Sequence, residues 1–356
     1  MTAAARPNRG FHDTLERRTH LYVDACIQAW PDADYADAHR HGATAYGVTA
    51  FMPHVPFEQA VEDLMFWHLV ARQHPHLSVA FSAQDIRNAH ARGDAVFVLS
   101  SQDGDFVGQK LHRIETLYRL GLRVTLLAYN RTNTLSGGVF EAEDTGLTRL
   151  GVRVVQECNR VGMVLDGSHM ARRATLEMIE TSADPAVFTH ANPRHLCQHP
   201  RNITDEQILA CTARGGVIGL VNWGPLVQKD GQLTRPTLDD FIDHLDYVCD
   251  LTGSARHVGI GSDMSLGTYP PHDHDPWGDG DYPNPMGRYN LIPDMPTAPT
   301  SPLRFADGFD SFAQVPQLTG RLAERGYSDE DIGAFLGGNF LRVFEQVWKP
   351  VEGGGT

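Results

Sequence analysis

The sequence has few cysteines and no long hydrophobic run. The five cysteines among its 356 residues show no C-x-x-C spacing, so we expect no disulfide framework. No apolar stretch reaches the roughly 7–15 residues of a secretory signal or the roughly 20 of a spanning helix. The sequence therefore predicts a cytoplasmic protein with reduced thiols and no membrane partner.

Positive charge is also scarce. The chain has 30 lysines and arginines against 44 aspartates and glutamates, a formal net charge of -14. Nucleic acid and anionic lipid bind basic surfaces, so we expect no nucleic-acid partner. The composition, 41% hydrophobic and 21% charged, is ordinary for a folded enzyme with a sizeable core.

Short apolar runs alternate with amphipathic stretches along most of the chain. The runs show little strict alternation, as expected for strands buried on both faces. The predicted strands are Leu21–Gln28, Ala43–Met52, Ala95–Gln102, Val124–Asn130, Met163–His169, Ala186–Asn192, Val217–Trp223 and His257–Asp263.

The stretches between these runs have helical periodicity. In Phe57–Gln73 the spacing places Phe57, Val61, Leu64, Met65 and Leu69 on one face. Strand and helix repeated eight times predict an α/β fold, a TIM-like (β/α)8 barrel, rather than an open doubly wound sheet. No G-x-G-x-x-G follows the first run, which also disfavours the open sheet. Further predicted helices are Leu147–Asn159, Ala171–Thr181 and Thr204–Arg214.

We expect one domain over residues 21–350, preceded by an N-terminal extension over residues 1–20. Residues 265–306 are rich in Pro, Gly, Asp and Tyr, and they leave the eighth predicted strand directly. Such a loop is either an active-site lid or a surface excursion. Residues 311–348 are predicted to form C-terminal helices that close the barrel and could support a homodimer.

Polar residues end several of the predicted strands. In a parallel barrel these ends meet at one mouth, where catalytic residues lie. Two imidazoles and a carboxylate from separate strands would make a metal or acid–base site there. Each residue also has a structural interpretation: a buried histidine is often hydrogen-bonded core, and a buried cysteine is often a small hydrophobe. The strand-end candidates are Asp24, Cys26, Gln28, Gln102, Tyr129, His169, His190 and Asp263.

Several motifs resemble the membrane (renal-type) dipeptidase family, peptidase family M19 of the amidohydrolase superfamily. Leu165–His169 (LDGSH) resembles the family's D-x-S-H, and Phe188–His190 (FTH) with Arg201-Asn202 resembles its F-S-H…R-N. Gly259–Asp263 (GIGSD) resembles G-I-G-S-D-F-D-G, and Arg325–Val347 resembles the C-terminal signature. Residues 124–133 and 152–166 extend the likeness, which together spans most of the chain.

The resemblance implies a TIM-like barrel that holds two zinc ions in typical members. It assigns His169 and His190 as ligands of the second zinc. Asp263 matches the aspartate that handles the proton of the attacking water, and Arg201 matches the arginine that holds the substrate carboxylate. Asn202 and the neutral Gln102 and Gln28 would then face the substrate.

The sequence departs from the family at the first metal. Cys26 and Gln28 stand where the family has an H-x-D pair, and Gln102 stands at the bridging glutamate. Tyr129 replaces the histidine of T-H-N, and Ser265 replaces the second aspartate of D-F-D-G. Neutral amides remove the negative charge that two divalent cations need, so we expect at most one zinc ion.

Three hypotheses follow for the function. The first is a divergent, metal-dependent hydrolase that acts on a small amino-acid-derived or peptide-like carboxylate, with Asp263, Tyr129 and Cys26 as candidate catalytic residues. The second is a metal-free acid–base enzyme, a lyase, isomerase or cyclase of a biosynthetic pathway, on the same barrel. The third is a non-catalytic homologue that binds a ligand or a partner chain.

Overall fold

The computed structural model describes residues 20–30, 32–35, 42–230, 234–267 and 304–351. Its parallel sheet runs in the order β6-β5-β4-β2-β1-β8-β7, with β3 added beside β4 and β9 beside β1. The strands are β1 Val23–Ala29, β2 Ala45–Thr49, β3 Leu77–Val79, β4 Ala95–Ser101, β5 Leu122–Leu126, β6 Val164–Asp166, β7 Ile218–Leu220, β8 Val258–Ile260 and β9 Ser265–Leu266.

The sheet curls so that its two edges approach one another. Between β6 and β7 the chain makes two parallel bridges, Asp166 with Val187 and Phe188 with Ile218. The sixth predicted strand, Ala186–Asn192, is thus present as bridges rather than as a regular strand. The predicted TIM-like barrel is confirmed, and the strand–helix repeat is the pattern that predicted it.

Small side chains, mostly valine, from alternate strand positions fill the interior of the barrel. They form one buried cluster with the C-terminal helix α12 (Asn339–Val347), whose Phe340 and Phe344 pack against them. Helix α12 therefore closes the end of the barrel opposite the carboxyl ends of the strands. The strand residues in this cluster are Val23, Ala25, Ala45, Val96, Val98, Val124, Val164, Val187 and Val217.

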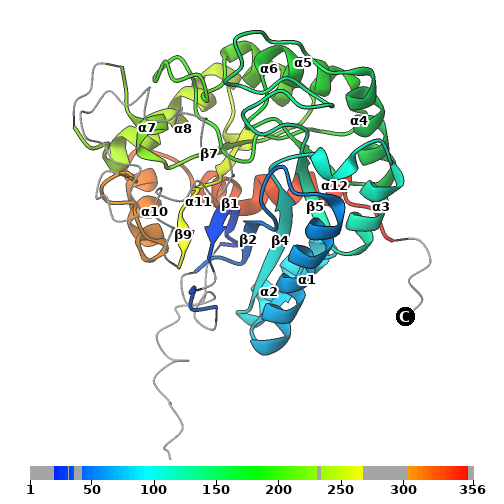
Figure 1. Cartoon of the computed structure of the whole chain (residues 1–356). Helices are drawn as coiled ribbons and strands as arrows, with labels where there is room; N and C mark the ends of the chain where they lie inside the picture. The colour runs from blue at the N-terminus through cyan, green and yellow to red at the C-terminus, as the bar shows by residue number, and fades with distance from the viewer. Residues whose placement is uncertain (1–19, 31, 36–41, 231–233, 268–303, 352–356) are drawn as a thin grey trace, which may run out of the picture.

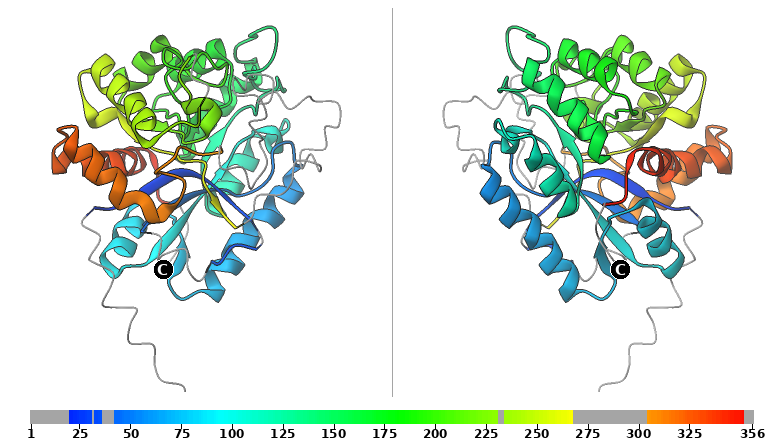
Figure 2. Two further views of the ribbon diagram at one scale, coloured as in Figure 1. Left: turned by 90° about the vertical axis from the view of Figure 1, so that its left-hand side faces the viewer. Right: turned by 90° about the vertical axis from the view of Figure 1, so that its right-hand side faces the viewer.

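The helices form an outer layer around the strands (Figures 1 and 2). Several begin at side-chain caps, among them the capping boxes of Thr204 and Ser328. The helical segments are α1 Phe57–Gln73, α2 Ala83–Arg92, η2 Asp105–Val107, α3 His112–Arg119, α4 Arg149–Val161, α5 Arg172–Thr181, α6 Asp205–Ala213, α7 Gly224–Val227, α8 Leu238–Thr252, η3 Ala255–His257, η4 Phe312–Gln314, α10 Val315–Glu324, α11 Asp329–Gly333, η5 Ala334–Gly338 and α12.

The apolar face predicted for α1 is partly wrong. Leu64 is buried, but Met65 is 36% exposed and Leu69 is 49% exposed. The helix instead buries Trp67, whose indole donates to the carbonyl of Ala50. Aromatic contacts to the sheet therefore decide which side of α1 faces inward, and periodicity alone cannot rank two apolar faces.

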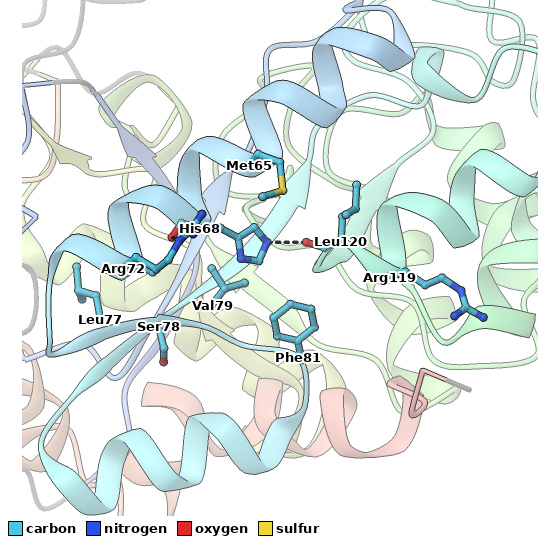
Figure 3. Close-up of a pocket in the computed structure, with 10 residues that line it drawn as sticks. Met65, His68, Arg72, Leu77, Ser78, Val79, Phe81, Arg119 and Leu120 are labelled. Carbon is cyan, nitrogen blue, oxygen red and sulfur yellow. Dashed lines mark hydrogen bonds between the residues drawn. The ribbon is translucent and has the colours of Figure 1, made fainter. Parts of the chain in front are cut away.

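A groove of about 460 Å³ runs beside this exposed edge of α1. Figure 3 shows Met65, Val79 and Phe81 around it, with His68 bonded to the carbonyl of Leu120 at 2.7 Å. Leu120 precedes β5, so the groove lies toward the amino ends of the strands. It is separate from the barrel mouth where the predicted site residues gather.

Two parts of the predicted organisation cannot be compared with the structure. The extension over residues 1–20 falls almost entirely, and the proposed lid over 265–306 falls mainly, outside the described residues. Within the described part of the chain, no helix combines the length and the apolar character needed to span a bilayer.

Candidate active site

The predicted site residues gather at the carboxyl ends of the strands. In β1 the pairing register with β2 shifts between Asp24 and Ile27. Such a bulge redirects the side chains that follow it. Ala25 packs in the barrel interior, whereas Cys26 and Gln28 reach toward Asp263 beyond β8. Asp24 instead links β1 to the segment after β8, since it accepts hydrogen bonds from the backbone and hydroxyl of Ser262.

His169 and His190 lie face to face in the mouth. Their Nε2 atoms are 2.8 Å apart, and both side chains are buried. Burial and the nearby Arg201 hold the pKa of each imidazole well below its usual value, so both histidines are neutral.

A hydrogen-bonded chain fixes the tautomer of His190. Its Nδ1 lies 2.7 Å from the Thr189 hydroxyl, which donates its own proton to Asp166. The hydroxyl therefore accepts from His190, which must carry its proton on Nδ1 and offer a lone pair at Nε2. Asp166 acts as a brace, as it also accepts from the backbone and hydroxyl of Ser168.

Arg201 is a buried cation at the mouth. Its Nε donates to His169 Nδ1 at 3.1 Å and its Nη2 donates to the His190 carbonyl at 2.9 Å. Its Nη1 is buried and has no protein partner. Burial lowers the pKa of Arg201 to about 10, against the opposing pull of Asp166, Tyr129, Asp263 and Cys26, so the guanidinium remains charged at neutral pH.

Asp263 sits in a network of uncharged donors. Gln28 Nε2 donates to its Oδ1 at 2.7 Å, and the Cys26 thiol lies 3.8 Å from the same oxygen. Gln102 Nε2 in turn donates to Cys26 Sγ at 3.3 Å. Burial raises the pKa of Asp263, while Gln28, Arg304, Arg201 and Cys26 oppose the rise.

Cys26 is a neutral thiol in this network. Burial and then the carboxylates of Asp263, Asp166 and Asp24 raise the pKa of its thiol well above the usual value. A nucleophilic cysteine needs the opposite environment, one that stabilises the thiolate. The geometry therefore supports a hydrogen-bonding role for Cys26.

Tyr129 and Asn130 hold His169 from two sides. The Tyr129 ring stacks on the imidazole with centroids 4.1 Å apart, and Asn130 Oδ1 lies 2.8 Å from Nδ1. Both residues follow β5, which ends at Leu126 rather than at the predicted Asn130. Asn202, predicted to face the substrate, uses its amide nitrogen to bind the carbonyls of Cys197 and Leu226.

Strained backbone marks the same end of the barrel. Among the described residues, the non-glycine residues with positive φ are His54 (64°), Asn130 (60°) and Asp263 (59°). Each follows the carboxyl end of a strand. Left-handed backbone at non-glycine residues is costly, and it concentrates where function requires it.

The described donor set at the mouth is small for a metal centre, since it offers two histidine nitrogens where a catalytic zinc ion normally has three protein ligands. His169 and His190 offer two converging nitrogens, and His190 has the buttressed Nδ1 that metal-ligating histidines usually show. Over the described ranges, no other histidine, cysteine or carboxylate brings a ligand atom within 4.8 Å of both. At the first-metal positions, Cys26, Gln28 and Gln102 supply no negative charge.

A second group of potential ligands lies nearby and is not apparent from the sequence. His54 Nδ1 is 3.3 Å from Asp103 Oδ2 and 3.0 Å from Asp105 Oδ2. Hydrogen bonds to the two carboxylates raise the pKa of His54 to about 9, so the imidazole is protonated and ion-paired at neutral pH. The cluster ties the loop after β2 to the loop after β4.

Comparisons with known proteins agree with this architecture. The profile of the membrane dipeptidase family (peptidase family M19) matches residues 31–275 and 298–352. An uncharacterised dipeptidase of Schizosaccharomyces pombe is 28% identical over 67% of the chain and 49% of its own length. Dipeptidase verJ of Clonostachys rogersoniana is 28% identical over 78% of the chain and 62% of its own length. The chain thus spans half to three-fifths of these relatives.

A solved structure extends the likeness to nearly the whole fold. An amidohydrolase from Pseudomonas aeruginosa superposes with a TM-score of 0.81 at 26% identity. The match covers 93% of the chain and 98% of that structure.

Proposed function

The chain belongs to the membrane dipeptidase family (peptidase family M19), and from this premise we propose that it is a metal-dependent hydrolase. Its substrate is a small, peptide-like molecule with a free carboxylate, and the bond broken is an amide. One observation carries the proposal: Arg201 is a buried, charged guanidinium whose Nη1 lacks a protein partner beside Asp263 and the histidine pair.

An unpaired buried donor is costly, and a carboxylate is the group that best satisfies an arginine. Binding of the substrate carboxylate at Nη1 would orient the neighbouring amide in the mouth. The stacked Tyr129 stands beside His169, where its hydroxyl can donate to the oxygen on which negative charge develops.

Asp263 is the proposed proton-transfer residue. Its carboxylate would take a proton from the attacking water and return it to the leaving amine. Gln28 donates a hydrogen bond to this carboxylate, and burial raises its pKa, which favours the return step. His169 and His190 would hold a single zinc ion, which when bound supplies Lewis-acid polarisation of the amide carbonyl.

The test is a panel of dipeptides and N-acyl amino acids, assayed with zinc by mass spectrometry. We expect cleavage that requires the free carboxylate, so the matched C-terminal amides should be poor substrates. Asp263→Asn should lower kcat at least about 100-fold while ligand binding persists. Arg201→Met should raise KM, whereas Arg173→Met, which removes an exposed arginine paired with Glu177, should not. Equal cleavage of the acids and their amides would refute the assignment of Arg201 as the group that binds the substrate carboxylate.

A second function is favoured by the neutral network around Asp263. Gln102, Cys26 and Gln28 form hydrogen bonds where the resemblance would require metal ligands. A metal-free lyase, isomerase or cyclase would use Asp263 for proton transfer and Arg201 for anchoring. Turnover that survives chelation and disappears in Asp263→Asn would identify this alternative.

A further inference from the structure

One side of helix α1 exposes a group of large hydrophobic side chains. Met65, Phe66 and Leu69 are 36%, 41% and 49% exposed, and Phe81, 41% exposed, lines the same groove as Met65. In the described part of the chain, Leu209 on α6 is the one other large hydrophobic side chain so exposed. Single exposed apolar residues are ordinary, but a contiguous group indicates a surface that binds another molecule. Helix α1 lies at an outer edge of the molecule in both views of Figure 2, where a partner can reach it.

The exposed side of α1 also carries a gradient of charge. Glu58 and Glu62 are exposed near its amino end and Arg72 near its carboxyl end, with the hydrophobic residues between them. Charges in this order stabilise a helix through its dipole, but the dipole does not explain the exposed hydrophobic residues. Among the described residues Glu62 has no ion-pair partner, and Arg72 donates only to the carbonyl of His68, at 3.4 Å. Two opposite charges on this side are therefore available to another chain.

A second, antiparallel copy of α1 complements this pattern position by position. In a two-fold dimer the same surface of each copy takes part, so a contact of residue i with residue j is repeated as j with i. If the axis crosses α1 at the level of Trp67, the residues five positions before and after it face each other. Glu62 then faces Arg72 of the second copy, and Met65 faces Leu69 of the second copy. A parallel arrangement would bring like charges together.

The groove beside α1 extends this surface. It has a volume of about 460 Å³ and lies between α1 and residues 77–81, as Figure 3 shows. A specific interface buries at least about 1,000 Å² in total, so a dimer contact must extend beyond one side of one helix. The groove and Phe81 provide that extension. Among the C-terminal helices, α12 buries its apolar residues against the barrel, whereas α1 leaves its own exposed.

We propose that α1 and the groove beside it form the contact surface of a homodimer, in which α1 packs antiparallel against α1 of a second copy. The occupant is a second copy because the charges of this surface complement themselves under two-fold symmetry. Helix α1 leads back from the carboxyl end of β2 along the outside of the barrel. Antiparallel packing therefore points the two mouths in opposite directions, and neither copy covers the mouth of the other. The proposal is independent of the hydrolase activity.

Sedimentation velocity of the full chain over a range of concentrations measures the association. The wild type should form a dimer. Leu69→Glu places an unpaired charge from each copy in the middle of the contact, so the dissociation constant of the dimer should rise about 30-fold or more. Leu209→Glu is the matched control, since it adds the same charge at a leucine that is 45% exposed on α6, and it should leave the constant unchanged. Circular dichroism checks that both variants are folded.

Charge exchange tests the antiparallel pairing. Glu62→Arg and Arg72→Glu each place like charges opposite one another twice, so each variant alone should dimerise about tenfold more weakly than the wild type. In a mixture of the two variants, the two basic positions of one chain face the two acidic positions of the other, so a heterodimer should form. The double variant should dimerise as well as the wild type, because both pairs are restored with their signs reversed.

Three results would overturn the proposal. The first is a wild type that remains monomeric at about 100 μM, which would mean that no second copy covers this surface. The second is a dimer that persists in Leu69→Glu, which would place the contact elsewhere on the molecule. The third is dimerisation of the single charge variants at wild-type strength, which would exclude the pairing of Glu62 with Arg72.

Discussion

Asp263 lies among neutral hydrogen-bond donors and two arginines, and these neighbours lower the pKa of its carboxyl against the effect of burial. Burial alone would favour its neutral form. The Gln28 amide at 2.7 Å and the charges of Arg304 and Arg201 favour the carboxylate. Under the proposed function, Cys26 and Gln28, which stand where the resemblance implies an H-x-D metal-binding pair, tune the acidity of Asp263.

Gln28→Leu should shift the pH dependence of turnover. The substitution removes the hydrogen bond that lowers the pKa of Asp263, so the pKa should rise and the acid limb of the kcat/KM profile should move to higher pH. Cys26→Ser, which keeps a neutral donor, should leave that limb nearly unchanged. The profile with the panel substrate checks both, and an identical limb in Gln28→Leu would remove Gln28 from this role.

The approach of β8 to the segment that carries His190 depends on glycine. A Cβ at Gly261 would lie 1.7 Å from the backbone oxygen of Thr189, which cannot move without displacing His190. Gly261→Ala should therefore destabilise the protein by about 3 kcal/mol or more.

Helix α10 provides the matched control for this substitution. A Cβ at Gly320 would meet nothing within 4 Å, and Gly320→Ala should stabilise the helix by about 0.5–1 kcal/mol. Chemical denaturation of the two variants checks the pair. Equal stability of Gly261→Ala and the wild type would show that β8 can move away from Thr189.

The ion pairs of His54 join the loop after β2 to the loop after β4. Because the folded-state pKa is raised to about 9, the contribution is complete below the unfolded pKa of about 6.5 and is lost as pH rises through 9. His54 is partly exposed, so we discount the contribution to about 1 kcal/mol.

Denaturation at pH 6 and pH 9.5 measures this contribution. The wild type should lose about 1 kcal/mol more than His54→Gln between these pH values. The comparison with His54→Gln cancels the other titrating groups. Equal losses would mean that Asp103 and Asp105 do not hold His54 as an imidazolium.

The metal content of the whole molecule follows from its charges. A formal charge of -14 attracts divalent cations weakly over the whole surface, so only tight binding is informative. We expect at most one tightly bound zinc per chain after dialysis, measured by elemental analysis, and none in His169→Ala. Two tightly bound ions would contradict the neutral first-metal positions.

The family, the barrel and the location of the mouth could all be predicted from the sequence. Strand and helix periodicity are local, and the carboxyl ends of parallel strands must meet, so His169, His190 and Asp263 could be grouped without coordinates. The sequence predicted a regular sixth strand, but the structure has only bridges there. It also predicted the wrong buried face for part of α1. Both features depend on which neighbouring elements pack against these segments.

The pairing of individual atoms was decided by the tertiary structure alone. Gln28 and Asp263 are 235 positions apart, and closure of the barrel brings their side chains within 2.7 Å. The contacts of Arg201 and Asn130 with one nitrogen of His169, and the cluster of His54 with Asp103 and Asp105, arise in the same way. A sequence specifies which groups are present, but hydrogen bonds depend on distance and direction, which only the folded chain fixes.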